Sequence, residues 1–305
     1  MNKIYNYQNG NYSVDVYEDG TKIRNSQESE FIAEFPDSVD VKITNYCDLS
    51  NVCVYCHEKS DRAGIHGDLS LIETAWKELP SGVELACGGG DTLSHPDFPE
   101  FAKRMTENRK IINLTCNQLH LKKYAATLSV LTEKNYIRGL GVSLRDVNQQ
   151  IPKTIMEYPN TIFHCIAGID SANYIRRLID ICAKPKILLL GYKNFGNGIQ
   201  HLQTNGKPIT KNIQLLYNQL PVLLHEISKK QGILSFDNLA IAQLNPKRVL
   251  SESDYDRFYQ GEDGKNTFYV DVVTKTFARN STSTERFPIL PSAKLMFRYL
   301  NSPRH

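Results

Sequence analysis

The feature of the sequence that most restricts its fold is a repeated alternation of short apolar runs and amphipathic stretches. The apolar runs predict six strands near residues 39–44, 82–87, 111–116, 137–143, 161–167 and 186–191. The stretches between and after them predict helices near residues 70–79, 98–109, 121–134, 146–157, 171–183 and 209–229. Pro221 is expected to kink or split the last helix. Repeated strand–helix units indicate an α/β protein with a parallel sheet, here a partial (β/α)6 TIM-like barrel.

The chain is expected to have three parts. Residues 1–37 predict a small N-terminal β element, because apolar and polar residues alternate from Tyr12 to Val16. Residues 38–232 carry the six units of the partial barrel. Residues 233–305 form a C-terminal α+β extension with a further strand near Ile233 and a β-hairpin near 267–279. Ser281, which follows the hairpin, is expected to lie on the surface.

Three cysteines follow the first of the six predicted strands. Cys47, Cys53 and Cys56 are separated by five and then two residues. In an α/β barrel the carboxyl ends of the strands carry the active site, so these thiols fall where chemistry is expected. Three thiolates within ten residues can hold a metal if the backbone wraps around it.

The cysteine spacing alone leaves three interpretations open: an iron–sulfur cluster, a zinc site, or plain buried residues. Tetrahedral zinc takes four ligands, commonly as two separated pairs. The remaining cysteines form no second pair, and they are Cys87, Cys116, Cys165 and Cys182. A four-iron cluster held by three thiolates leaves one iron open to a small molecule, and this interpretation is favoured.

The cysteine stretch resembles the motif of radical S-adenosylmethionine (radical SAM) enzymes. These enzymes place three cysteines after the first barrel strand, with an aromatic residue directly before the last cysteine. Tyr55 is the aromatic residue here. The usual spacing is three residues and then two, so the first loop is longer here. The turn after the second strand resembles the family's Gly-Gly-Glu motif, which contacts the amino group of S-adenosylmethionine. Gly89, Gly90 and Asp91 match it, with Asp91 in place of glutamate.

The ends of the later strands also resemble cofactor-binding elements of this family. Asn117 falls on a Thr-Asn-Gly-like turn, and Ser143 lies in a Gly-x-Ser-Leu element near the nucleotide. Arg145 is either a bidentate partner of the cofactor carboxylate or a solvated arginine at a helix start. Ile166 and Gly168 match the loop that packs against adenine.

Asp170 follows Ile166 and Gly168 in the same stretch and is expected to cap the following helix. Tyr192 and Lys193, after the sixth strand, are hypothesised as substrate contacts, because the cofactor would occupy the first strand ends.

The resemblance implies a radical SAM enzyme with a [4Fe-4S] cluster and S-adenosyl-L-methionine as cofactors. It also implies a one-electron reductant, such as flavodoxin or ferredoxin, as a partner. The substrate is unidentified: a peptide or protein, a nucleotide or base, and a small metabolite all stay open. The alternative function is a zinc-binding interaction protein on an α/β barrel scaffold.

The overall charge and the apolar content add two expectations. The 305 residues include 36 basic and 33 acidic side chains, a net charge of +3, which argues mildly against a long nucleic acid and leaves weak nucleic-acid binding open. The sequence has no run of about 20 apolar residues and begins with a polar segment, so we expect a cytoplasmic protein with no membrane partner.

Overall fold

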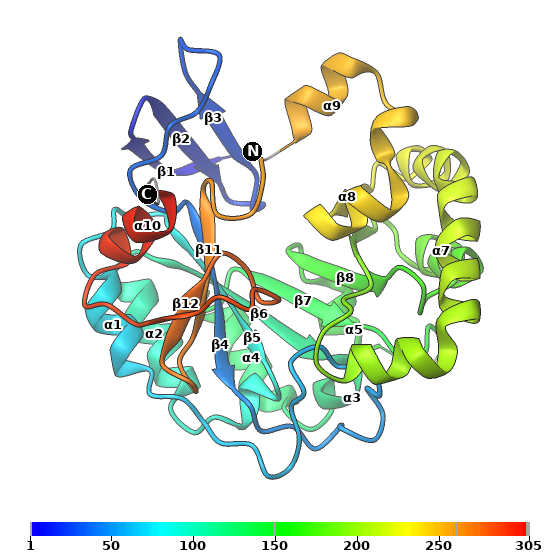
Figure 1. Cartoon of the computed structure of the whole chain (residues 1–305), viewed down its shortest axis with the longest axis horizontal. Helices are drawn as coiled ribbons and strands as arrows, with labels where there is room; N and C mark the ends of the chain where they lie inside the picture. Colours follow the sequence, from blue (N-terminus) through cyan, green and yellow to red (C-terminus); the bar gives the residue numbers. More distant parts are fainter. Residues whose placement is uncertain (1, 149–150, 260, 303–305) are drawn as a thin grey trace.

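The protein is built around a single large sheet, seen in a computed structural model that describes residues 2–148, 151–259 and 261–302 (Figure 1). Ten strands lie in the order β10-β9-β8-β7-β6-β5-β4-β11-β12-β13. All six predicted strands are present and neighbour one another in chain order, which confirms the α/β class. They are β4 (Ser38–Thr44), β5 (Glu84–Gly89), β6 (Ile111–Asn117), β7 (Gly139–Ser143), β8 (Thr161–Ile166) and β9 (Lys186–Leu190).

The sheet continues beyond the six predicted strands on both sides. β10 (Ile233–Phe236) pairs in parallel with β9, and β11 (Thr267–Asp271) pairs in parallel with β4. β11 also forms the predicted hairpin, with Val270 opposite Phe277 on β12 (Thr276–Ala278), and β13 (Phe287–Pro288) follows. The C-terminal segment therefore supplies a strand to each flank of the predicted set.

Helices connect the strands and cover one face of the sheet. Those of the first six units are α1 (Ser70–Trp76), η1 (Thr92–Ser94), α2 (Phe98–Glu107), α3 (Gln118–Leu121), α4 (Ala125–Glu133), α5 (Lys153–Glu157), α6 (Ala172–Ile181) and α7 (Asn197–Lys229). The C-terminal ones are α8 (Asn238–Leu244), η2 (Pro246–Arg248), α9 (Glu252–Phe258) and α10 (Ala293–Asn301). The predicted helix at 121–134 corresponds to α4, which the short α3 precedes, and α5 is the helix that the described residues form within 146–157.

The expected break at Pro221 is wrong, because α7 departs from helical geometry at Asn205 instead. Proline removes the hydrogen bond to the carbonyl four residues earlier, which for Pro221 is that of Tyr217. Arg248 donates a hydrogen bond to this carbonyl from η2. The helix can therefore continue through Pro221 without an unsatisfied acceptor.

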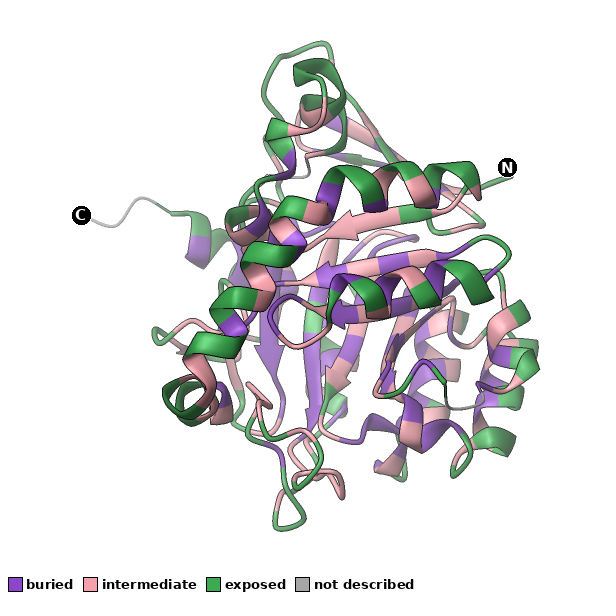
Figure 2. Ribbon diagram, turned by 90° about the vertical axis from the view of Figure 1, so that its right-hand side faces the viewer, coloured by how far each residue is buried: buried purple, intermediate pink, exposed green. Residues whose placement is uncertain are grey.

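The strands bury one face against the helices and turn the other toward the interior of the molecule. Residues such as Val39, Leu85, Leu140 and Ile187 are completely buried in the main hydrophobic core. Figure 2 shows the corresponding pattern, with buried residues concentrated in the strands and exposed residues on the outer sides of the helices. The intervening strand residues are only partly buried and line a cavity.

The N-terminal β element forms as predicted and packs against the amino ends of the parallel strands. β1 (Lys3–Asn9), β2 (Tyr12–Tyr17) and β3 (Lys22–Asn25) form an antiparallel sheet. Lys22 pairs with Glu84 at the start of β5 at 2.6 Å, and Asn160 donates to the Glu18 carbonyl at 3.0 Å. The small sheet thus lies at the opposite end of the molecule from the cysteine loop (Figure 1).

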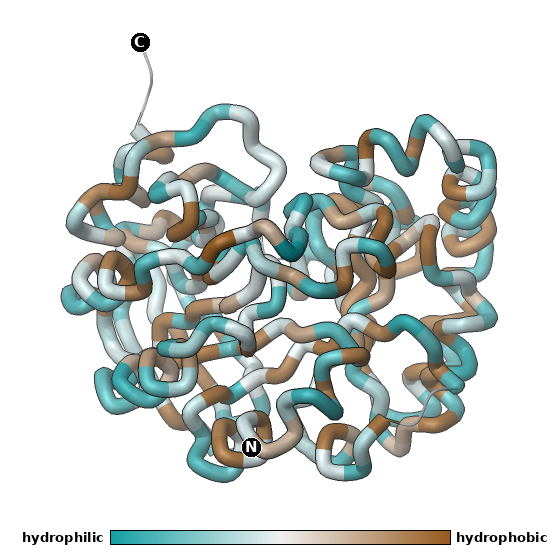
Figure 3. Tube along the Cα trace, turned by 90° about the horizontal axis from the view of Figure 1, so that it is seen from below, coloured by the Kyte–Doolittle hydropathy of each residue, from teal (hydrophilic) through white to brown (hydrophobic). Residues whose placement is uncertain are grey.

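Apolar and polar residues alternate over short distances along the chain (Figure 3). Among the helices in the described ranges, none combines the length and the apolar character that spanning a membrane requires.

Candidate active site

A cavity of about 770 Å³ lies against the inner face of the parallel sheet and reaches the carboxyl ends of its strands. It gathers most of the residues that the sequence singled out. Those that line it are Cys47, Cys53, Tyr55, Cys56, Gly89, Gly90, Asn117, Ser143, Arg145, Ile166, Tyr192 and Lys193. Asp91 and Gly168 do not line it.

The cysteine loop is folded by its own backbone hydrogen bonds. Cys53 donates to the Leu49 carbonyl and Cys56 to the Cys53 carbonyl, both at 2.9 Å, while Cys47 donates to the Asp61 carbonyl at 2.8 Å. The three thiols are partly buried and free of disulfides. Burial raises the pKa of Cys47 to about 11, so this thiol is protonated at neutral pH unless a metal displaces the proton.

The long spacer between the first two cysteines is anchored through Asp48. Its carboxylate lies 2.7 Å from His120 Nε2 on α3 and accepts a hydrogen bond from Lys123 at 3.0 Å. The Cys47 thiol, the Asp48 carboxylate and a His120 ring nitrogen all lie within 4.8 Å of one another. The extra loop length therefore connects the first cysteine to the end of β6.

The glycine turn after β5 supports the segment that leads to Cys47. Gly90 donates to the Thr44 carbonyl at 2.9 Å, and the Asp91 amide donates to the Tyr46 carbonyl at 2.7 Å. A Cβ atom on Gly90 would lie 2.1 Å from the Tyr46 oxygen, so only glycine fits this close approach. The turn and the cysteine loop are thus held together by backbone contacts.

The carboxylate of Asp91 points away from the cavity and is fully engaged elsewhere. It accepts hydrogen bonds from Tyr124 Oη at 2.6 Å and from Lys123 Nζ at 3.2 Å, and it lies 3.5 Å from His120 Nδ1. The side chain predicted to contact a cofactor amino group is therefore part of the network that holds Asp48. The sequence offered no sign of this, because Lys123 and Tyr124 lie more than thirty residues away.

The ends of β6 and β7 present hydrogen-bond donors to the cavity. Asn117 caps α3 by accepting from the Leu119 amide at 3.0 Å, and its side-chain nitrogen lies 3.6 Å from the Cys53 sulfur. The guanidinium of Arg145 lies 5.1 Å from the centre of the Tyr55 ring. Its buried Nε has no hydrogen-bond partner among the described residues. Arg145 therefore retains a free donor inside the site.

The turn after β8 differs from the prediction at one residue. Asp170 does not cap α6; Ser171 does, by accepting from the Tyr174 amide at 3.2 Å. The Asp170 carboxylate instead accepts from the Ile166 amide at 2.6 Å and lines the cavity. Gly168 packs against α7, where an added Cβ would lie 2.8 Å from Ile209.

The predicted substrate contacts after β9 are both bonded within the protein. The Tyr192 hydroxyl donates to the Gly198 carbonyl at 2.8 Å. The Lys193 ammonium donates to Ser281 Oγ at 3.0 Å and lies 3.3 Å from His57 Nε2. Ser281 lines the cavity, so its predicted surface position is wrong. The hairpin brings it back to the interior because β11 pairs with β4.

The loop after β9 also packs on the last cysteine. The Asn197 amide donates to the Cys56 carbonyl at 3.0 Å. An added Cβ on Gly196 would lie 2.3 Å from the His57 oxygen and 3.0 Å from the Cys56 oxygen. The residues next to Lys193 thus form the support behind Cys56.

Several charged residues of the cavity were missed by the sequence analysis. Lys42 pairs with Glu58 at 2.9 Å, and Glu58 also lies 3.3 Å from the ring of His57. Asp40 and His164 project into the same space from β4 and β8. Asp40 and Lys42 at alternate positions of an otherwise apolar strand were the signal that could have revealed them.

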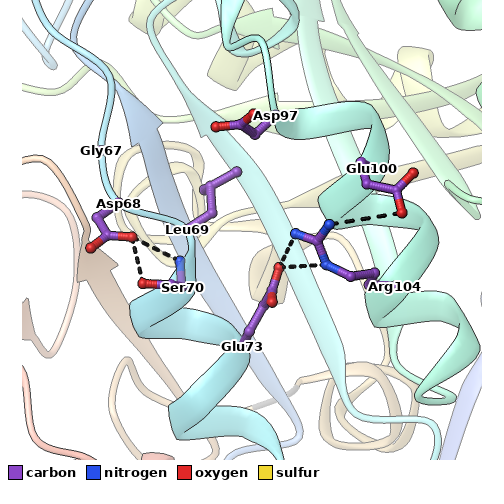
Figure 4. A pocket seen from close by; sticks show the side chains of 8 residues that line it. All are labelled: Gly67, Asp68, Leu69, Ser70, Glu73, Asp97, Glu100 and Arg104. Carbon is purple, nitrogen blue, oxygen red and sulfur yellow. Dashed lines mark hydrogen bonds and ion pairs between the residues drawn. The ribbon is translucent and has the colours of Figure 1, made fainter.

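A second cavity of about 240 Å³ lies beside α1 and α2 and contains none of the predicted site residues. Figure 4 shows Arg104 between two acidic side chains, with Glu73 and Glu100 as its partners. The one guanidinium of this cavity is held by these two carboxylates, and we assign the cavity no function.

The fold and the cavity define an α/β protein with a large interior site at the carboxyl ends of parallel strands. Solved structures of SuiB from Streptococcus suis share this fold. The structure bound to S-adenosylmethionine has a TM-score of 0.58 at 14% identity, covering 89% of this chain and 65% of that chain. The structure bound to the precursor peptide SuiA has a TM-score of 0.57 at 16% identity, covering 90% and 63%.

The likeness to SuiB is one of fold, since the sequences have diverged widely. This chain spans less than two thirds of the length of these SuiB chains. No protein-family model matches the chain, and no curated protein matches its sequence.

Proposed function

We propose that the protein is a radical SAM enzyme with a partial-barrel core, in which Cys47, Cys53 and Cys56 bind a [4Fe-4S] cluster and S-adenosylmethionine occupies the adjoining cavity. The observation that carries this proposal is the position of the three thiols, which follow β4 and line the same cavity as most of the other residues matched to the family. The fold shared with SuiB, a protein that binds S-adenosylmethionine, supports it.

The donor groups of the cavity fit these two cofactors. Three thiols can ligate three irons of a cluster, and the Asn117 side chain can donate a hydrogen bond to the Cys53 sulfur, a contact of the kind that tunes cluster potentials. The unpartnered Nε of Arg145 can donate to the cofactor carboxylate. Ser143 and Ile166 line the cavity beyond it and would contact the nucleotide.

When bound, the cluster and S-adenosylmethionine would supply one-electron chemistry, namely the reductive cleavage of a carbon–sulfur bond and the removal of a hydrogen atom from the substrate. The electron would come from a reductant such as flavodoxin or ferredoxin. The part played by this chain is to hold both molecules in one orientation and to limit stray hydrogen donors around them. Enclosure by the sheet and by the loop after β9 suits that task.

We further propose that the substrate is a peptide, a class supported by the precursor peptide bound to SuiB. Tyr192 and Lys193 are the proposed contacts on the substrate side. Because both side chains already bond to Gly198 and Ser281, substrate binding would exchange or extend these contacts.

The proposal is tested by anaerobic reconstitution with iron and sulfide. A cluster protein is brown and contains about four iron and four sulfide per chain. The alternative, a zinc-binding interaction protein, gives a colourless protein that retains zinc instead. With a strong reductant the enzyme is expected to convert S-adenosylmethionine to 5'-deoxyadenosine and methionine. Formation of S-adenosylhomocysteine alone, or zinc in place of iron, would contradict the proposal.

A further inference from the structure

The cavity extends well below the proposed cofactor site. Its lining includes residues at the amino ends of the strands, among them Ser38, Glu84, Asn113 and Ile162. Asp40 lies near the middle of β4, four residues before Thr44 at the strand end. At about 3.3 Å per residue, this is about 13 Å from the end that leads into the cysteine loop. The lower part of the cavity is therefore separate from the cysteines.

Asp40 faces open space in this lower part. In the parallel register it lies between Ala86 on β5 and Tyr269 on β11. Ala86 has only a methyl group, so it leaves room beside the carboxylate. Asp40 is exposed to the cavity, while the Tyr269 hydroxyl is directed to Glu58. The carboxylate can thus be reached by a ligand in the cavity.

Asp40 differs from the other carboxylates of the cavity because it has no partner among the described residues. Each of the others is satisfied by a nearby donor. These pairs are Glu58 with Lys42 at 2.9 Å, Glu84 with Lys22 at 2.6 Å, Asp170 with the Ile166 amide at 2.6 Å, and Asp237 with the Gly191 and Ala240 amides at 2.9 and 2.7 Å. The Asp40 carboxylate is accessible within the cavity, so its oxygens are free to accept hydrogen bonds from a ligand that supplies donors.

The charges around Asp40 favour a cation. Desolvation by the surrounding protein raises the pKa of Asp40 to about 6, so the group is largely ionised at neutral pH, and Glu84, Asp263 and Glu58 repel it. Lys193 is the lysine whose positive charge acts on the Asp40 carboxylate. Its ammonium already contacts Ser281 Oγ and His57 Nε2. His164 on the β8 wall adds no positive charge, because burial lowers its pKa to about 4.

We propose that Asp40 binds a cationic group of the substrate, an ammonium or a guanidinium, so that the substrate is a peptide with a basic side chain. This inference rests on the proposed function and adds to it the chemical class of the side chain that enters the cavity. A carboxylate with open space beside it can accept two hydrogen bonds from such a group. The basic side chain would lie below the cofactor, with its backbone toward Tyr192 and Lys193.

The test compares small probes of equal length in the reconstituted protein with S-adenosylmethionine present. N-acetyl-lysine methylamide and N-acetyl-arginine methylamide carry the cation, and N-acetyl-norleucine methylamide lacks it. Calorimetry is expected to show at least tenfold tighter binding of the cationic probes to the unmodified protein. In Asp40→Asn this preference should fall below about threefold while the iron content is retained. Asp256→Asn, an exposed change on α9, is the control that keeps the full preference.

Two results would overturn the inference. One is equal binding of the three probes to the unmodified protein, and the other is a cation preference that survives in Asp40→Asn. Iron content and formation of 5'-deoxyadenosine by the unmodified protein are measured on the same samples. If these are normal while the preference is absent, only the substrate class is wrong. If they are absent, the proposed function itself fails.

Discussion

Replacing Gly196 with alanine is expected to damage cluster binding although residue 196 is no proposed ligand. Gly196 has φ 56° and ψ −131°, a conformation that costs other residues about 1–3 kcal/mol. The new Cβ would lie 2.3 Å from the His57 oxygen, whereas ordinary contact begins near 3.4 Å, so the two backbones must separate by about 1 Å. Metal–ligand distances tolerate deviations of only about 0.2 Å. Displacement of the Cys56 backbone should therefore lower the iron content.

The measurement is the iron and sulfide content after reconstitution, together with the electron paramagnetic resonance signal of the reduced cluster and the melting temperature. We expect Gly196→Ala to retain less than half the iron of the unmodified protein and to melt several degrees lower. Gly206→Ala is the matched control. Gly206 lies within α7, its nearest neighbour is 4.0 Å away, and alanine in a helix is favoured by about 0.5–1 kcal/mol. Full iron content and an unchanged melting temperature in Gly196→Ala would refute the reasoning.

Three further predictions concern the cysteines, the cofactor and acid stability. Iron should be lost in each of the alanine variants of Cys47, Cys53 and Cys56 and retained in Cys182→Ala; an essential Cys182 would contradict the three-cysteine cluster. Arg145→Gln should weaken S-adenosylmethionine binding about tenfold, the loss of one charged hydrogen bond, with normal iron content; unchanged affinity in equilibrium dialysis would remove Arg145 from the site. The pKa of His164 in the folded protein is about 4, below its ordinary value of 6.5, so between these pH values the unfolded chain binds more protons than the folded one. The free energy of unfolding therefore falls as the pH drops from 6.5 to 4, by at most about 3 kcal/mol. Urea unfolding of His164→Gln should show a smaller acid loss than the exposed control His225→Gln, and equal losses would contradict this pKa.

The sequence was most informative where the evidence is local. Alternating apolar residues located all six central strands, and the rule that sites gather at carboxyl strand ends grouped the cysteines with Asn117, Ser143 and Arg145. Periodicity identifies a strand but does not choose its neighbour. The parallel pairing of β11 with β4 was therefore missed, and with it the interior position of Ser281.

The sequence also did not predict in which direction the side chain of Asp91 points. Asp91 occupies the predicted position in the chain, yet its carboxylate is drawn to Tyr124 and Lys123, which lie on the next strand–helix connection. Conversely, Asp40 is conspicuous only once Glu58 and Glu84 are seen to have partners. Such pairings join residues far apart in sequence, where no spacing rule applies.

The segment from Tyr192 to Gly198 contacts both the cysteine loop and the C-terminal segment, so the two are structurally coupled. Asn197 bonds to the carbonyl of Cys56, while Lys193 in the same loop bonds to Ser281 beyond the hairpin. Grafting a different C-terminal segment onto this chain would consequently alter the wall behind the third thiol as well as the floor of the cavity. Evolution of a new substrate preference through residues 261–302 would thus be constrained by the geometry of Cys56, and compensating changes would be expected within the loop that joins the two.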